Sequence, residues 1–558
     1  MKIINFIKLR IHLLFLLISV SSLIFIYLNY INIKSYAWIS KNTFILILLQ
    51  LTINSSAVFA VLFLPTYPIF FLLMKNKNYH FREILGISIV SNSSFFIIAG
   101  FIGSWIKISI TFEYFFFLTI VTYFSLILIT IFRDLRRSTS SIFKKVQIVE
   151  IKDGFKSIFK LFHKFGFTSG LLLIIFITLF CILNLVNTSF FAGTDVWLHL
   201  SLVRYIKELN VIPIDQYYGA FGLHIFGVVI YYFSGINLII LPKCFIFYTV
   251  PLCSLIFYNI FMRIFKNKNL AILGVFLLVS SFGFSWYMMV QFWPSAITLI
   301  QGLVLFSLFY IRLQGFLEEN VPEREDISSN ILSFYILSIF IFISSLLTHS
   351  LLIMIIITSY LWLYLIYFTK NYRRGFDLIL ILTFFSIFFI FYFFNISTGY
   401  FQVFDPFKLI PWYYFLFGSL GFAFIVVLIL LRYRKLMDFS KGKYKSIITG
   451  KNKKFYKIIE NKIIFPLIFF LTFFLSIVFT LFNIAVMNIF TTYIIYFIEM
   501  LLISSFAVWG IFLFRYKPRG KPLFIWGLAL DTLFFLIFLY DAIIGFTTFF
   551  LRVYFITT

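Results

Sequence analysis

The stretch LLIMIIITSYLWLYLIYFT, residues 351–369, has no charged side chain along its whole length. A helix of about 20 apolar residues crosses the roughly 30 Å hydrocarbon core of a bilayer. Similar runs recur along the chain, which is 62% hydrophobic and 12% charged, with a mean hydropathy of +1.04. These runs do not alternate with polar residues as the strands of an outer-membrane barrel do. The sequence therefore predicts an all-α protein, a polytopic transmembrane helical bundle.

The basic residues indicate on which side of the membrane each loop lies. The net charge is +26, and Lys and Arg concentrate in short segments between apolar runs, as they do in cytoplasmic loops. This pattern predicts anionic membrane lipid, and not nucleic acid, as a partner. Lys2, Lys8 and Arg10 place the N-terminus in the cytoplasm of a multi-pass protein of the cell membrane. The other segments expected inside are 75–82, 133–164, 263–268, 370–374, 432–462 and 515–521.

About 15 spans are expected between these loops, in three parts of the chain. Residues 1–165 are expected to form a four-span bundle with a basic cytoplasmic loop, and residues 166–431 a core that carries the functional site. Residues 432–558 are expected to form a second basic cytoplasmic loop and a three-span bundle. The expected spans lie near 11–33, 46–74, 84–106, 112–132, 167–187, 244–264, 269–289, 294–313, 331–348, 351–369, 377–395, 411–431, 464–487, 491–514 and 522–545.

One apolar stretch, residues 223–241, is not counted as a span. If it crossed the membrane, the basic segment 263–268 would lie outside, against the charge rule. We therefore expect a re-entrant or interfacial helix on the outer face, interrupted at Ser234-Gly235 and ended by Pro242.

Polar side chains gather in the segments that this topology places outside. Such side chains are costly near the apolar phase and usually mark a site. The densest group begins at Gly193-Thr-Asp-Val-Trp-Leu-His-Leu200, and juxtamembrane helices of the outer face are expected to carry it. The candidate residues are Asp195, His199, Arg204, Asp215, Tyr217, His224, Gln291, Trp293, His349, Asp405 and Lys408.

Asp195 precedes an amphipathic run, Val196 to Leu209, and two roles are open to it. It can cap that helix, as Asp and Thr both do, although Thr194 could cap equally well. If Thr194 is the cap, the Asp195 carboxylate can act as a general base, hold a divalent metal or orient an acceptor hydroxyl.

His199 and Arg204 follow on the same run. His199 lies four residues after Asp195 on the same helical face, so the two can form an oriented carboxylate–imidazole couple or only a local surface pair. Arg204 shares the polar side of the run with Ser201 and Glu208. It can reach lipid headgroups or bind a phosphate group.

Three further candidates lie at expected turns. Phe221-Gly222-Leu223-His224 predicts a turn that enters a helix, where His224 can meet an anionic group beside free backbone N–H donors. His349 is either a functional side chain or the polar tip of a tight hairpin between two spans. Gln291-Phe-Trp-Pro294 predicts another outer hairpin, in which Trp293 can be an interfacial residue.

Several kinds of functional motif are missing from the sequence. It has no Gly-rich phosphate loop, zinc-ligand spacing or nucleophile elbow. The lack of a nucleotide-binding loop argues against an ATP-driven pump. Cys181, Cys244 and Cys253 all lie in apolar segments and make no disulfide or metal framework. No cofactor motif is found in the sequence, and a requirement for a divalent metal is left as an open alternative.

The segments Gly193–Ile206, Ile212–Tyr218, Phe221–Phe226 and Gln291–Pro294 resemble the GT-C superfamily of polytopic membrane glycosyltransferases, in particular its prokaryotic, archaeal-type members. The resemblance covers about residues 167–431, which makes 166–431 a GT-C-like core. Four expected spans precede the motif, no large soluble domain follows the last expected span, and the Trp-Trp-Asp-Tyr-Gly signature of oligosaccharyltransferases is missing. These departures favour transfer of a single hexosyl or pentosyl unit over transfer of a whole oligosaccharide.

The resemblance implies a sugar donor linked to polyprenyl phosphate and a glycan, lipid or protein acceptor on the extracytoplasmic face. Asp195 would match the acidic residue of the first outer loop, the candidate catalytic base. A transporter or flippase of lipid-linked glycans is the competing class, and a non-catalytic membrane scaffold is a third. The residues expected to bind substrate, by motif or by chemistry, are His199, Arg204, Asp215, Tyr217, His224, Gln291 and His349.

Overall fold

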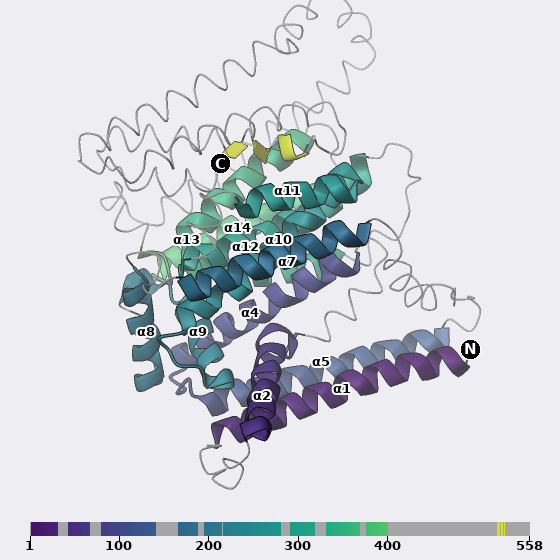
Figure 1. Cartoon of the computed structure of the whole chain (residues 1–558). Helices are drawn as coiled ribbons and strands as arrows, with labels where there is room; N and C mark the ends of the chain where they lie inside the picture. Colours follow the sequence, from purple (N-terminus) through teal and green to yellow (C-terminus); the bar gives the residue numbers. More distant parts are fainter. Residues whose placement is uncertain are drawn as a thin grey trace, which may run out of the picture. The chain divides into compact units, whose positions relative to one another are not determined.

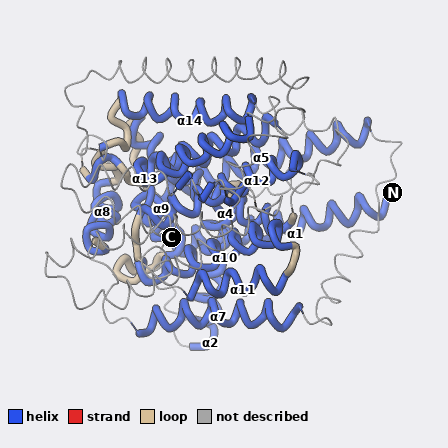
Figure 2. The backbone as a smooth tube through the Cα atoms, turned by 90° about the horizontal axis from the view of Figure 1, so that it is seen from above, coloured by secondary structure: helices blue, strands red, loops and turns tan. Residues whose placement is uncertain are grey.

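The structure is a computed structural model. It describes residues 2–31, 43–66, 80–140, 166–187, 195–214, 216–280, 291–317, 331–368, 375–399, 520, 522–524, 526–527 and 529–530. Within these residues the regular structure is helical and no strand is found (Figure 2). The prediction of an all-α protein is confirmed for this part of the chain.

The chain divides into two compact units. Unit 1 comprises Met1–Ser280, Met289–Ile311 and Asp326–His349, and unit 2 comprises Ser281–Met288, Arg312–Glu325 and Ser350–Thr558. The helices α1 to α11 belong to unit 1, α14 belongs to unit 2, and the unit boundaries fall inside α12 and α13. Figure 1 labels these helices. Their bounds are α1 Lys2–Tyr30, α2 Thr43–Phe63, α4 Phe81–Trp105, α5 Phe112–Ser140, α7 Gly166–Asn187, α8 Val196–Leu209, α9 Gly222–Ser234, α10 Leu241–Phe265, α11 Lys268–Ser280, α12 Pro294–Leu317, α13 Ile331–Phe368 and α14 Gly375–Phe393.

Five of the described helices are long and apolar enough to cross a membrane. A 25-residue helix such as α4 or α10 is about 37 Å long, more than the roughly 30 Å of a hydrocarbon core. The chain is therefore a multi-pass membrane protein by the length and composition of its helices. About 15 spans stays a prediction, and the expected spans 411–431, 464–487 and 491–514 lie outside the described residues. The five stretches are Phe81–Trp105, Phe112–Ile129, Leu241–Phe265, Pro294–Leu313 and Phe334–Leu361.

The short helix α9 is enclosed by other helices of unit 1. It packs against α1, α2, α4, α5 and α8, and nine of its thirteen residues are buried. Thirteen residues extend about 20 Å, too little to cross the hydrocarbon core. The length agrees with the expected re-entrant helix, whereas the burial excludes a helix that lies only on the surface.

The boundaries of α9 are set by its glycines. The helix ends at Ser234 because Gly235 takes a left-handed conformation (φ 65°), the usual C-terminal stop. The break expected at Ser234-Gly235 is thus confirmed. Pro242, however, does not end this helix. It lies in the first turn of α10, where its missing N–H has no intrahelical partner to lose.

His349 does not lie at the tip of a hairpin loop. Residues on both sides of it are helical and belong to one element, α13, whose backbone leaves helical geometry only at His349 (φ −158°, ψ 86°). The spans expected at 331–348 and 351–369 therefore meet at a single non-helical residue, and the predicted tight hairpin is a kink.

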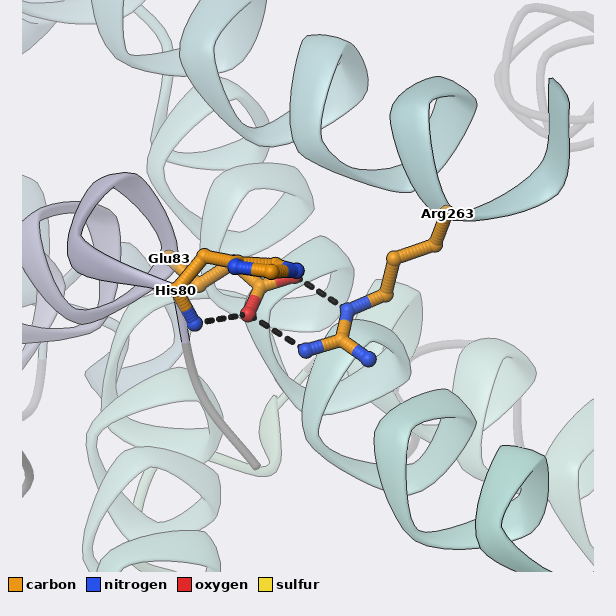
Figure 3. A network of polar contacts seen from close by, with 3 residues as sticks. All are labelled: His80, Glu83 and Arg263. Atoms are coloured by element: carbon orange, nitrogen blue, oxygen red, sulfur yellow. Dashed lines mark hydrogen bonds and ion pairs between the residues drawn. The ribbon is translucent and has the colours of Figure 1, made fainter. Parts of the chain in front are cut away.

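A buried ion pair joins the first turn of α4 to the last turn of α10. Glu83 accepts two hydrogen bonds from the Arg263 guanidinium, one of them 2.6 Å long from Nη2 to Oε2, and a third of 2.8 Å from the backbone N–H of His80 (Figure 3). The Glu83 side chain is 1% exposed and that of Arg263 12%. The charge pattern predicts that the loops next to both residues lie on the cytoplasmic side. The ion pair agrees with this prediction, because it places the two helix ends next to each other. A second pair, Arg312 with Asp377, joins α12 to α14 in unit 2.

Candidate functional site

The helix α8 presents one polar side chain of interest to the interior of unit 1. It runs from Val196 to Leu209, as the amphipathic pattern predicted, and His199 is buried on the face that packs against α9 (Figure 1). Trp197, Leu198 and Tyr205 lie exposed on the other side. An exposed face of aromatic and aliphatic side chains is typical of a helix at a membrane interface.

Asp195 occupies the N-cap position of α8, but its side chain makes no cap hydrogen bond. Its backbone carbonyl accepts the first bond of the helix, 3.0 Å from the N–H of His199. The side chain is half-buried, one turn before His199. Of the two roles open to Asp195, capping is thus not the one that its carboxylate takes in this structure.

A left-handed turn brings Tyr217 to the same place. Tyr217, Tyr218 and Gly219 have φ angles of 46°, 56° and 72° in succession. This conformation costs a non-glycine residue roughly 1–2 kcal/mol, and such strain tends to persist where the surrounding structure fixes a functional side chain. Here the turn sets the ring of Tyr217 edge-on to His199 and to His224, with centroids 5.1 Å and 5.2 Å away.

The centre of the site is a contact between two histidines. His199 Nδ1 lies 3.0 Å from His224 Nε2, and the other nitrogen of His199, Nε2, lies 3.5 Å from the Tyr217 hydroxyl. A bond between two neutral imidazoles requires one nitrogen to donate and the other to accept. The tautomers of the two rings are therefore coupled to each other.

His224 is completely buried, in the first turn of α9. Its Nδ1 atom has no hydrogen-bond partner. Burial, and next the nearby His199, hold the pKa of His224 well below its usual range. The ring is neutral at pH 7, so it suits a hydrogen-bonding or proton-carrying role better than that of a fixed positive charge for phosphate.

Two other parts of the chain close around this pair. Phe292 lies edge-on to His199, with centroids 6.4 Å apart, and Gln291 beside it is buried with an unpartnered Oε1. On another side, α13 touches α9 so closely that a Cβ atom built on Gly222 would lie 2.1 Å from the Thr348 hydroxyl. His349 follows Thr348 and is buried as well.

A polar cluster inside unit 1 continues from Thr348. The Thr348 hydroxyl donates to the Ser344 carbonyl, 2.8 Å away, one turn earlier on α13. Gln301 of α12 donates to the Ser344 hydroxyl at 2.8 Å and to the Ser94 hydroxyl of α4 at 3.3 Å. All four side chains are buried, and Gln301 Oε1 and the Thr298 hydroxyl have no hydrogen-bond partner.

The expected site residues fall into four groups. His199, Tyr217 and His224 are in direct contact, and Asp195, Gln291 and His349 lie on segments adjacent to them. Arg204 is not among them, because it lies on the exposed side of α8 and binds Glu208 at 2.7 Å, with 70% of its side chain exposed. Its charge agrees with a surface role toward lipid headgroups. Asp215, Asp405 and Lys408 lie outside the described residues.

Three contributors were not recognised in the sequence. Phe292 lies within the hairpin predicted at Gln291–Pro294, but no role was predicted for it, for Thr348 or for Gln301. A polar side chain within an apolar span was the available signal for Gln301. No sequence signal marks the contact between Gly222 and Thr348, since it depends on how α9 and α13 pack.

The described residues contain no group of three or more His, Cys, Asp and Glu side chains arranged to hold a metal ion. Comparisons of the chain with protein-family models, with curated proteins and with solved structures gave no match.

Proposed function

We propose that the protein is a membrane glycosyltransferase that moves a sugar from a polyprenyl-phosphate-linked donor to an acceptor on the extracytoplasmic face. The observation that carries the proposal is the convergence of His199, Tyr217 and His224, with Asp195 one turn away on α8. Polar side chains brought together near a membrane are usually functional, because their burial is costly. A scaffold would not need this arrangement.

The reaction would be a displacement at the anomeric carbon of the donor sugar. A new bond forms between the acceptor oxygen and this carbon as the bond from the carbon to the phosphate oxygen breaks. Asp195, the candidate base, takes the acceptor's proton, and the lipid phosphate leaves with the electron pair of the broken bond. His349 is the candidate phosphate contact, while the neutral His224 is a hydrogen-bonding group.

The competing proposal is a transporter or flippase of lipid-linked glycans. One observation favours it, namely the buried polar cluster of Gln301, Ser94 and Ser344 among helices long enough to span. Such interhelical hydrogen bonds are also ordinary packing contacts of membrane helices, so this observation carries less weight than the histidine site.

The test is a transfer assay with purified protein in liposomes. A panel of polyprenyl-phosphate sugars and a mixture of acceptors are supplied outside only, without ATP or an ion gradient. The proposal predicts a new glycosidic bond on an acceptor with at least one donor. Movement of labelled lipid-linked sugar across the bilayer without any new glycosidic bond would replace the transferase proposal by the flippase.

A further inference from the structure

The histidine pair is part of a longer row of contacts. From the half-exposed ring of Tyr217 the row passes through both nitrogens of His199 to Nε2 of His224, at 3.5 Å and 3.0 Å. It ends at His224 Nδ1, which is buried and has no hydrogen-bond partner. Every contact in this row joins atoms that can both donate and accept a proton.

We propose that Tyr217, His199 and His224 form a proton relay between the surface of unit 1 and its buried polar interior. A proton taken up at His224 Nδ1 is matched by release of the proton on His224 Nε2 to His199 Nδ1. His199 in turn passes its Nε2 proton to the Tyr217 hydroxyl, and this hydroxyl releases its own proton to water. One proton enters and one leaves, and both rings end in the opposite tautomer, so the next transfer requires the rings to return.

The helix turn that carries the inner end of this relay packs against a segment of α13 that bears other polar groups of unit 1. Gly222, two residues before His224, touches Thr348. The Thr348 hydroxyl donates to the Ser344 backbone carbonyl, and Gln301 Nε2 donates to the Ser344 hydroxyl. The unpartnered atoms Gln301 Oε1 and Thr298 Oγ1 belong to the same interior. The relay therefore ends in the same buried part of unit 1 as this set of hydroxyl and amide groups.

Two features distinguish a relay from a pair of histidines used only for packing. Packing alone would be served by apolar side chains, because a buried donor or acceptor without a partner costs about 1–3 kcal/mol. Packing also gives no reason for two consecutive tyrosines in the left-handed conformation, which holds the Tyr217 hydroxyl near His199. The relay does not depend on glycosyl transfer, since it would serve any reaction that releases or needs a proton inside unit 1.

The test is nitrogen-15 NMR on full-length protein in lipid nanodiscs, labelled only at its six histidines. Histidine-to-glutamine variants assign the signals. The relay predicts that the His224 N–H exchanges with water although the ring is buried, and that its two nitrogens show shifts averaged between tautomers. Tyr217→Phe keeps the ring and its packing but removes the hydroxyl, and it should slow this exchange at least tenfold. His199→Gln should fix His224 in one tautomer.

Tyr218→Phe is the matched control, because Tyr218 shares the left-handed turn but its ring is 43% exposed. It should leave the exchange unchanged. A wild-type His224 held in one tautomer without exchange would overturn the relay, and so would an exchange rate unaffected by Tyr217→Phe. If His199→Gln does not fold, the comparison of Tyr217→Phe with Tyr218→Phe decides alone.

Discussion

Gly222 is a residue of α9 that lies against Thr348 of α13. A Cβ atom built there would lie 2.1 Å from the Thr348 hydroxyl and 2.8 Å from the Thr348 Cα. A side-chain oxygen can rotate away, but a Cα atom moves only with its helix. The absence of a side chain at position 222 is thus a condition for this close packing of α9 against α13.

Gly222→Ala is expected to destabilise the protein. Overpacking of this kind costs about 1–3 kcal/mol, occasionally more. Gly86→Ala in α4 is the control, because its Cβ would meet nothing closer than 3.5 Å, and alanine favours a helix over glycine by up to about 1 kcal/mol. Thermal unfolding in detergent should show a lower midpoint for Gly222→Ala and an equal or higher one for Gly86→Ala. Equal midpoints for Gly222→Ala and wild type would contradict the close contact.

His224 is expected to make the folded state sensitive to acid. The pKa of a histidine in the unfolded chain is near 6.5, and burial lowers the pKa of His224 well below that. Below pH 6.5 the unfolded state therefore binds a proton that the folded state does not. As the pH is lowered below 6.5, the free energy of unfolding therefore decreases, by at most about 1.4 kcal/mol per pH unit for one proton.

The measurement is the unfolding midpoint between pH 7.5 and pH 5, for wild type and for His224→Gln. The variant should lose less stability than wild type over this range, because it has no imidazole to protonate on unfolding. Parallel curves for the two proteins would show that His224 is not held neutral.

At the scale of elements, the pair Glu83–Arg263 fixes α4 to α10. Taking one partner away from a buried pair leaves an uncompensated charge, at a cost of roughly 3–5 kcal/mol. Arg263→Met should therefore lower the unfolding midpoint strongly. Arg82→Met is a control from the first turn of α4, since the Arg82 guanidinium lies 4.8 Å over the Tyr258 ring, a contact worth about 0.5–1 kcal/mol when exposed. If both variants lose the same stability, the ion pair does not fix these helices.

The sequence predicted some elements well because their limits are local. The amphipathic run 196–209 became α8 with the same bounds, and Gly235 ended α9 through its own backbone conformation. The hairpin geometry considered for His349 was wrong because a polar residue between two apolar runs fits a hairpin tip and a helix kink equally. Only the packing of α13 decides between them.

The histidine site was also predictable only in part, because local sequence patterns do not encode contacts between helices. Helical spacing predicted that His199 shares a face with Asp195, and the turn at Phe221-Gly222 placed His224 at a helix start. That His199 contacts His224 depends on how α8 packs against α9, which no local pattern encodes. The burial that keeps His224 neutral follows from the same packing.

For the molecule as a whole, the sidedness of the helices can be measured by cysteine labelling. Ser201 on α8 and Lys268 at the start of α11 are both exposed, and α10 is the spanning helix between them if α9 does not cross. In a protein without its three native cysteines, Ser201→Cys should react only from outside and Lys268→Cys only from inside. Arg373→Cys should also react from inside. Reaction of positions 201 and 268 from the same side would mean that α9 crosses the membrane.

The central claim is that Asp195 carries sugar transfer. Asp195→Asn keeps the size of the side chain and the ability to cap α8, but it removes the base. With donor and acceptor outside the liposomes, the variant should fold like wild type and form glycosylated acceptor about 100-fold more slowly or worse, the usual contribution of a general base. Ser201→Ala, on the exposed side of the same helix, should keep the wild-type rate. Equal rates for Asp195→Asn and wild type would contradict the claim.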